Sequence, residues 1–212
     1  MKDLLRVEIG GEEMGLGNRY IRWGQILILA DLHLGKTMHF RKSGMALPPE
    51  ARKTDQTAFI ALLDEEQPER VIILGDLFHS EANTEVEELA MITSRYSEVE
   101  FLLIKGNHDI LSDADYRSLD MHTEEALKAG NLLLTHEPVE ASGNTMNLHG
   151  HIHPGVVLRG KGRQRLKVPC FHLSAHHFCL PAFGALTGLM AIAPKRGDRV
   201  FGVIDGGVVE LS

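Results

Sequence analysis

Short apolar runs that end in an acidic, amide or imidazole residue recur along the first two thirds of this chain. They are residues 25–30 before Asp31, 71–74 before Gly75 and Asp76, 101–104 before Asn107, and 132–134 before Thr135 and His136. Runs this short and this rich in isoleucine, leucine and valine are typical of strands buried on both faces of a sheet. The pattern therefore restricts the chain to a sheet-centred fold with polar chemistry at its strand ends.

Segments with helical spacing of apolar residues separate these runs. They are the stretches around Phe59 and Leu62 and around Val86 and Leu89. Strands that alternate with helices predict right-handed β-α-β units and a largely parallel sheet. Ligands of such sheets bind beyond the carboxyl ends of the strands, which is where the polar residues fall.

Beyond residue 140 the pattern changes to short strand-like segments separated by glycines, at residues 156–159, 165–168, 200–204 and 208–211. Turn residues between such segments predict antiparallel hairpins. We expect a second sheet packed on the first, with helices outside. For a chain of 212 residues the expected class is α/β (α+β), as one domain over residues 1–212.

The polar residues at the strand ends form five clusters. They are Asp31 and His33 in DLH, Asp76 and His79 in GDLFH, Asn107, His108 and Asp109 in GNHD, His136 in LTHE, and His151 and His153 in GHIH. A single histidine is more often a packed or surface residue than a ligand. A whole set at one edge of one sheet is not expected by chance, so we interpret it as a site.

The residue types indicate a metal site. On an extended segment, Asp31 and His33 point to the same side because side chains alternate. Gly75, Gly106 and Gly150 are expected to let the backbone turn sharply there. Carboxylates, an amide and imidazoles without thiolates suit Mn²⁺, Fe²⁺ or Zn²⁺. Six or seven ligands are too many for one ion, and two ions bridged by a carboxylate form the clamp of phosphoester hydrolysis.

The order DxH, GDxxH, GNHD, H, GHxH resembles the calcineurin-like metallophosphoesterase superfamily. The resemblance implies a four-layer β-sandwich of two mixed sheets flanked by helices. It also implies two divalent ions, with Mn²⁺ favoured. Their ligands would be Asp31, His33, Asp76 and His153 in one site and Asp76, Asn107, His136 and His151 in the other.

Within that superfamily the chain looks most like the DNA-ligase-associated metallophosphoesterases, a group of DNA damage response endonucleases. The similar segments are residues 30–36, 75–80, GNHD and 180–188. Many relatives have the motif GDxxDR, and this chain has His79 and Ser80 in place of its last aspartate and its arginine. The phosphate-binding role of that arginine is therefore not carried over to this chain. The resemblance implies a role in DNA repair and a DNA ligase and a helicase as functional partners.

Three residues are candidates for catalysis. His108 would protonate the leaving alkoxide, a role typically worth about 10²–10⁴ in rate. Asp109 would either orient His108 or cap the following helix. His79 would contact the phosphate or support a ligand.

Charge distribution points to the substrate. The net charge is 22 − 29 = −7, yet residues 141–197 contain no acidic residue and seven basic ones. Alternate charges at Arg159, Lys161, Arg163 and Arg165 would line one face of a hairpin. Basic residues along a groove follow a phosphate backbone, which favours a nucleic-acid substrate, DNA over RNA.

Two other functions stay open. The same metal site could serve a small-molecule phosphodiesterase or phosphatase, acting for example on cyclic nucleotides. A catalytically inactive scaffold is disfavoured because the ligands and His108 are intact. The N-terminal sequence turns acidic and glycine-rich and no apolar run reaches membrane-spanning length, so we expect a cytoplasmic protein.

Overall fold

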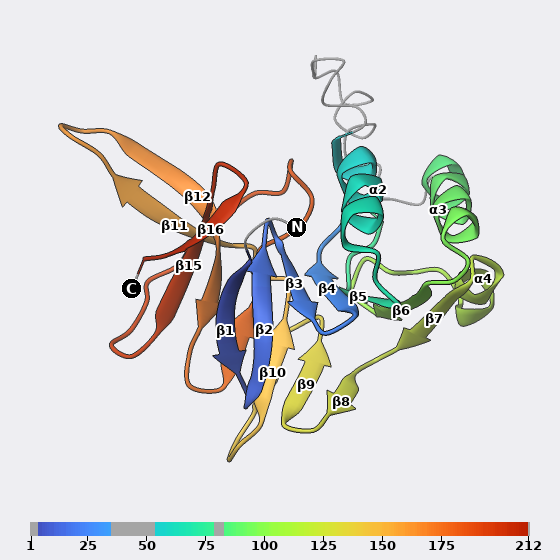
Figure 1. The fold of residues 1–212 in the computed structure, drawn as a ribbon, viewed down its shortest axis with the longest axis horizontal. Coiled ribbons are helices and arrows are strands. Elements are labelled where there is room, and N and C mark those ends of the chain that lie inside the picture. The colour runs from blue at the N-terminus through green and yellow to red at the C-terminus, as the bar shows by residue number, and fades with distance from the viewer. Residues whose placement is uncertain (1–3, 35–53, 79–82, 212) are drawn as a thin grey trace.

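The computed structural model describes residues 4–34, 54–78 and 83–211. Two β-sheets pack face to face, and helices cover the outer face of the first sheet (Figure 1). Within the described residues the helices are α2 (Thr54–Glu66), α3 (Asn83–Arg95) and α4 (Asp113–Ser118). The predicted class, with two mixed sheets, is confirmed.

The first sheet has its strands in sequence order. They are β1 (Leu5–Ile9), β2 (Glu12–Gly17), β3 (Tyr20–Trp23), β4 (Ile26–Ala30), β5 (Arg70–Leu74), β6 (Glu100–Ile104) and β7 (Met121–Glu124). β1 to β4 form an antiparallel meander, which the sequence pattern did not predict. β4 to β7 pair in parallel, as the alternation of strands and helices predicts.

The strands of the parallel half are buried on both faces. On β4, Leu27 and Leu29 contact the helices, whereas Ile28 packs between the sheets. Burying one such side chain stabilises the fold by about 1.5–3 kcal/mol. This double burial fixes the strands in place and aligns their carboxyl ends at one edge.

The second sheet is mixed. Its main path contains β14 (Met190–Ala191), β11 (Pro154–Arg159), β12 (Arg165–Leu173), β13 (His177–Cys179), β10 (Met146–His149), β9 (Leu132–Thr135) and β8 (Leu127–Ala129). β15 (Arg199–Ile204) pairs with β12 and with β16 (Gly207–Glu210). The predicted hairpins β11–β12 and β15–β16 are confirmed, but β10 pairs in parallel with β9 and β13.

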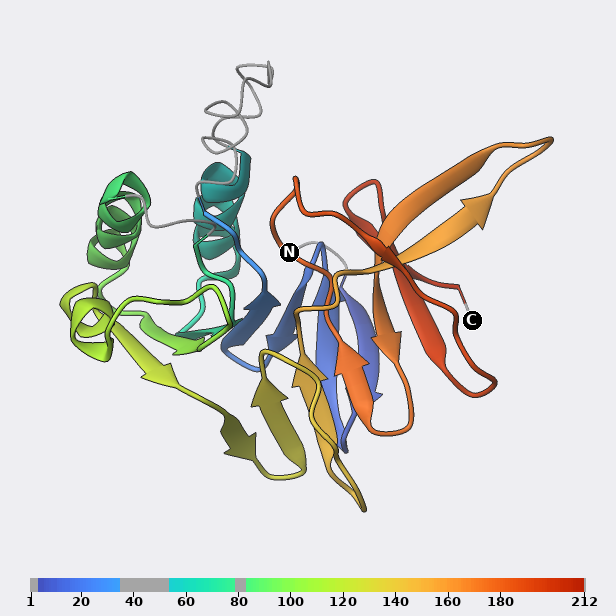
Figure 2. The same cartoon turned by 180° about the vertical axis from the view of Figure 1, so that it is seen from behind.

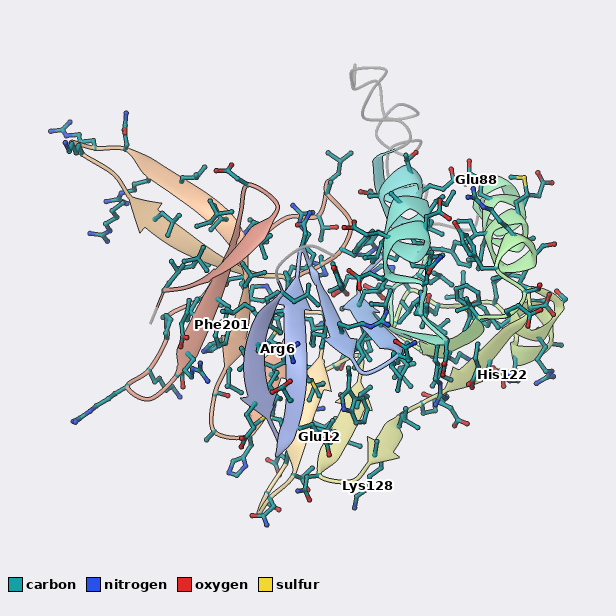
Figure 3. The ribbon with its side chains drawn as sticks, in the orientation of Figure 1. Arg6, Glu12, Glu88, His122, Lys128 and Phe201 are labelled. Atoms are coloured by element: carbon teal, nitrogen blue, oxygen red, sulfur yellow. The ribbon has the colours of Figure 1, made fainter. Side chains whose placement is uncertain are left out.

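Aromatic rings fill the space between the sheets. Phe171 and Phe178 are stacked with their centroids 5.7 Å apart. The ring of Phe201, labelled in Figure 3, meets Phe178 edge to face at 6.5 Å. All three rings come from the second sheet, and they belong to one core cluster with Ile28 and Ile72 of the first sheet.

The helices of the described residues all lie on the first sheet, so no helix from residues 4–34, 54–78 or 83–211 covers the outer face of the second. In Figure 2 the far end of the hairpin β11–β12 projects beyond the two packed sheets, and we call this hairpin the arm. None of the described helices is long and apolar enough to span a membrane.

Candidate metal centre

Loops that follow β4, β5, β6, β9 and β10 bring the predicted ligands together. Asp31, His33, Asp76 and His153 form one group, and Asp76, His136 and His151 form another, each with ligand atoms within 4.8 Å of one another. Asp76 belongs to both groups. This is the division that the family resemblance implies.

The backbone reaches this arrangement in an unpredicted way. Asp31, His33, Asp76, His151 and His153 all have left-handed backbone conformations, with φ between 47° and 65°. The prediction that ligand pairs share a side through strand alternation is therefore wrong, because β4 ends at Ala30 and β10 at His149. Aspartate and histidine tolerate this region better than most residues, although it costs roughly 1–2 kcal/mol per residue.

His136 is oriented by a backbone carbonyl. Its Nδ1 lies 3.0 Å from the Leu74 oxygen, so Nδ1–H donates and Nε2 keeps its lone pair. Metal-binding histidines are commonly fixed in this way. Nε2 then faces Asn107 Oδ1 at 3.1 Å, His151 Nδ1 at 3.1 Å and Asp76 Oδ1 at 3.4 Å. Asn107 thus joins the second group.

These atoms fit a cation. With bonds of about 2.0–2.2 Å, ligand atoms around one ion lie roughly 3.0–3.5 Å apart. In the first group, His153 Nε2 lies 3.2 Å from Asp31 Oδ1, and His33 Nε2 lies 3.9 Å from Asp76 Oδ2. His153 Nε2 is buried and has no hydrogen-bond partner. Lone pairs this close repel one another unless a cation or protons lie between them.

Gly106 and Gly150 allow neighbouring loops to approach closely and do not form the sharp turns that were predicted. Only Gly75 of the three predicted turn glycines has a positive φ, at 70°. At Gly150 a Cβ atom would lie 2.6 Å from Asp31 Oδ2 and 2.7 Å from Ala30 Cβ. At Gly106 it would lie 2.6 Å from Asp76 Oδ1. The ligand loops pack too tightly against one another for a side chain at these positions.

A segment that sequence reasoning gave no role supports the first ligand loop. Phe183 N donates to the Ala30 oxygen at 2.8 Å, and Gly184 N donates to the Asp31 oxygen at 3.2 Å. Asp55, at the start of α2, accepts from Ala185 N at 2.8 Å. Residues 182–185 therefore tie the Asp31 loop to the helix layer. The resemblance over residues 180–188 was the only sequence signal.

The GNHD loop places His108 beside the first group. The His108 ring is exposed and its centroid lies 6.3 Å from that of His33. Its backbone N–H donates to Asp76 Oδ1 at 3.3 Å. The imidazole therefore lies at the open side of the centre.

Asp109 is buried and holds loops together. Its two oxygens accept from Leu77 N at 2.9 Å and from Gly106 N at 2.8 Å. Burial raises the pKa of Asp109, although these hydrogen bonds oppose the shift. The alternative that Asp109 caps the next helix is wrong, because Ser112 is the N-cap of α4. His79 lies outside the described residues.

The predicted basic residues lie on the arm. Arg159 pairs with Arg165 across β11 and β12, so these two share a face. Lys161 and Arg163 lie in the connecting turn, where strand alternation does not apply. The arginines border a hollow of about 430 Å³. Within the described residues, no carboxylate forms an ion pair with any of the four.

A groove of about 440 Å³ opens beside the second group of ligands. Asn107 and His136 form its inner wall, with Lys105 and Thr135 next to them. The candidate centre is thus reachable from outside by a ligand of nucleotide size.

A two-sheet fold with two adjoining groups of carboxylates and imidazoles defines a metal-dependent hydrolase. Residues 24–177 match the family described as Calcineurin-like phosphoesterase. The chain belongs to this family and is a metal-dependent phosphoesterase.

This chain is similar to several solved structures. The nuclease MPE of Pseudomonas putida is 28% identical, with a TM-score of 0.80 over 98% of this chain and 100% of that one. The phosphoesterase YfcE of E. coli is 16% identical, with a TM-score of 0.40 over 88% of this chain and 97% of that one. A protein of unknown function from Aquifex aeolicus, AQ665, is 15% identical, with a TM-score of 0.40 over 60% and 78%. No curated protein matches the chain.

Proposed function

We propose that this protein is a dinuclear-metal-dependent phosphodiesterase that cleaves nucleic acid, with DNA favoured over RNA and an endonucleolytic role in DNA repair. The observation that carries the proposal is the continuity between the metal centre and the arm. β11 begins at Pro154, directly after His153. Its far end bears basic residues that form no ion pair with a carboxylate of residues 4–34, 54–78 or 83–211. The overall likeness to a nuclease supports the same substrate class.

In this proposal, Asp31, His33, Asp76 and His153 hold one ion and Asp76, Asn107, His136 and His151 the other. The donor set suits Mn²⁺, Fe²⁺ or Zn²⁺, and the family resemblance favours Mn²⁺. Two such ions, when bound, supply Lewis-acid charge that stabilises the oxygens of the phosphoryl group.

The chain's own residues complete the chemistry. The exposed His108 imidazole donates a proton to the leaving alkoxide oxygen, and the tie between His108 N and Asp76 sets its position. Asp109 acts as a positioning residue through its hydrogen bonds to Leu77 N and Gly106 N. His79, by its place in GDLFH, contacts the phosphate.

Arg159, Lys161, Arg163 and Arg165 bind the phosphate backbone away from the scissile bond. Like charges this close repel one another, and a polyanion relieves the repulsion. In the cell we place the protein in the cytoplasm, acting as a single domain in association with a DNA ligase and a helicase. The association with a DNA ligase and a helicase follows from the family resemblance.

The proposal is tested with purified protein and Mn²⁺ on single-stranded DNA, duplex DNA, matching RNA, 2′,3′-cyclic nucleotides and bis(p-nitrophenyl) phosphate. Asp76→Ala is the inactive control, because that carboxylate serves both groups of ligands. Cleavage of DNA internally, with the control inactive, supports the proposal. Turnover of the small esters without cleavage of any polymer would instead identify a small-molecule phosphodiesterase.

A further inference from the structure

The outer face of the second sheet carries a pocket of about 200 Å³ that the proposed mechanism does not use. Leu148 and Phe178 point into the core between the sheets, so their neighbours His149 and His177 face the other way. The pocket lies between these histidines, His172 and the side chain of Ile192.

This pocket shares a wall with the metal centre. Ile152 and Pro154 line it, and they alternate along the chain with His151 and His153. Gly150 links the two sites from the other side, because its oxygen accepts from His149 Nδ1 at 3.0 Å. A molecule in the pocket would therefore contact the loop that presents two metal ligands.

The lining suits a flat ring. Among the described residues that line it there is no carboxylate, lysine or arginine, and its surface is mostly apolar. The His149 and His177 rings lie edge to face at 5.7 Å, and both line the pocket, the His177 ring half-buried and the His149 ring buried. His172 is held by Asp198, with Nε2 2.8 Å from Oδ2. Imidazoles are among the side chains on which nucleobases stack.

One nitrogen of the pocket lacks a partner. His177 Nδ1 is buried without a hydrogen bond, a situation that typically costs about 1–3 kcal/mol. His149 donates from Nδ1, so its Nε2 carries a lone pair that can accept. A ligand with both a donor and an acceptor on its edge would satisfy the two rings together.

A metal ion fits this pocket less well than a ring. Within the part of the chain that the structure describes, the groups of ligand atoms close enough for an ion are those of the candidate centre, and His149, His172, His177 and Cys179 form none. The volume also exceeds the roughly 150 Å³ of a cavity that binds benzene. We propose that this pocket binds a planar heteroaromatic ring of nucleobase size. The inference rests on the proposed function in one respect only, the source of the ring. That source is either a base of the substrate strand or a free nucleoside.

Binding is tested on the metal-free protein, so that catalysis plays no part. Histidine ring signals are followed by NMR during titration with 2′-deoxyadenosine or thymidine, and 2-deoxyribose is the ring-free control. We expect the pocket histidines to shift with the nucleosides alone. Ile192→Trp, which fills the pocket with a larger side chain, should weaken binding at least fivefold. His177→Leu should weaken it too, and decides the matter if Ile192→Trp fails to fold. The matched control is His122→Leu, on exposed β7 (Figure 3).

The source of the ring is tested by cleavage of oligonucleotides that carry one abasic position each. If the ring comes from the substrate, one position should lower kcat/KM at least fivefold in the wild type but not in Ile192→Trp. If no abasic position lowers kcat/KM (a flat scan) and the nucleosides still shift the histidine signals, the ligand is a free nucleoside. DNA cleavage with a flat scan and no nucleoside shifts overturns this inference and leaves the proposed function standing. Nucleoside binding without cleavage of any polymer supports this inference and overturns the proposed function.

Discussion

The backbone N–H of His151 donates to both carboxylate oxygens of Asp31, at 3.2 and 3.0 Å, across 120 residues of chain. The bond joins the loop after β4 in the first sheet to the loop after β10 in the second. The two sheets therefore meet at the candidate metal centre itself, and an ion there would be held by both.

Asp31→Asn keeps the shape of this side chain but removes its charge. We expect one of two bound Mn²⁺ ions to be lost and turnover of bis(p-nitrophenyl) phosphate to fall at least about 100-fold. Replacing a metal ligand costs more activity than replacing a residue that only supports a ligand. Metal content after gel filtration measures the first effect. Asp64→Asn, at an exposed ion pair with Arg95, is the matched control. Two ions retained in Asp31→Asn would remove Asp31 from the ligand set.

His108→Ala should keep both ions and lose turnover by about 10²–10⁴-fold. The reason is that the His108 ring lies beside the centre, whereas the contact of His108 with Asp76 is made by its backbone N–H. Metal content and kcat are compared with those of His122→Ala, an exposed histidine on β7. Metal loss in His108→Ala would show that this residue is a ligand.

Gly150→Ala should destabilise the protein, because the new methyl group meets Asp31 Oδ2 and Ala30 Cβ. Overpacking of this kind costs about 1–3 kcal/mol, and the shift of Asp31 should also weaken Mn²⁺ binding. Urea unfolding and metal titration measure the two effects. Gly188→Ala, where a Cβ atom would meet nothing within 4 Å, should behave as the wild type. Equal stability of the two variants would contradict the close packing.

Replacing Arg163 and Arg165 together by glutamine should lower kcat/KM for DNA and leave that for bis(p-nitrophenyl) phosphate unchanged. Each lost phosphate contact should also reduce the salt dependence of DNA binding by about 0.7–0.9 in the log–log slope. Lys128→Gln, on β8 away from the arm (Figure 3), controls for charge alone. Equal losses on both substrates would place these arginines outside substrate binding.

Cys170 should not react with Ellman's reagent at pH 8 in the native protein. Burial raises the pKa of the Cys170 thiol to about 12, from an ordinary value of 9.0. The unfolded chain therefore loses this proton first, and stability should fall as pH rises from about 9 towards 12. Cys170→Ala should show a smaller fall in the urea midpoint between pH 8 and 10. Rapid labelling of the native thiol would contradict its burial.

Local sequence was sufficient for the parallel half of the first sheet and for the list of candidate ligands, whereas their division into two groups came from the family resemblance. Double-sided burial makes all of β4, and all but the first residue of β5 and of β6, apolar, so the runs are visible without any structure. The residues at their ends converge because parallel strands share one edge. The hairpins β11–β12 and β15–β16 were visible in the same way, through turn residues between short strands.

Only the tertiary structure decided how the ligands converge. The left-handed conformations of Asp31 and His33 go with hydrogen bonds to a distant loop, at Gly75 and Asp76, and strand alternation predicted the wrong backbone for them. The roles of Asp109 and of Phe183 depend likewise on partners far along the chain. A sequence records which groups can bind a metal, because that is a property of each side chain. It does not record the contacts that hold them 3 Å apart, because those belong to pairs of residues that meet only in the folded protein.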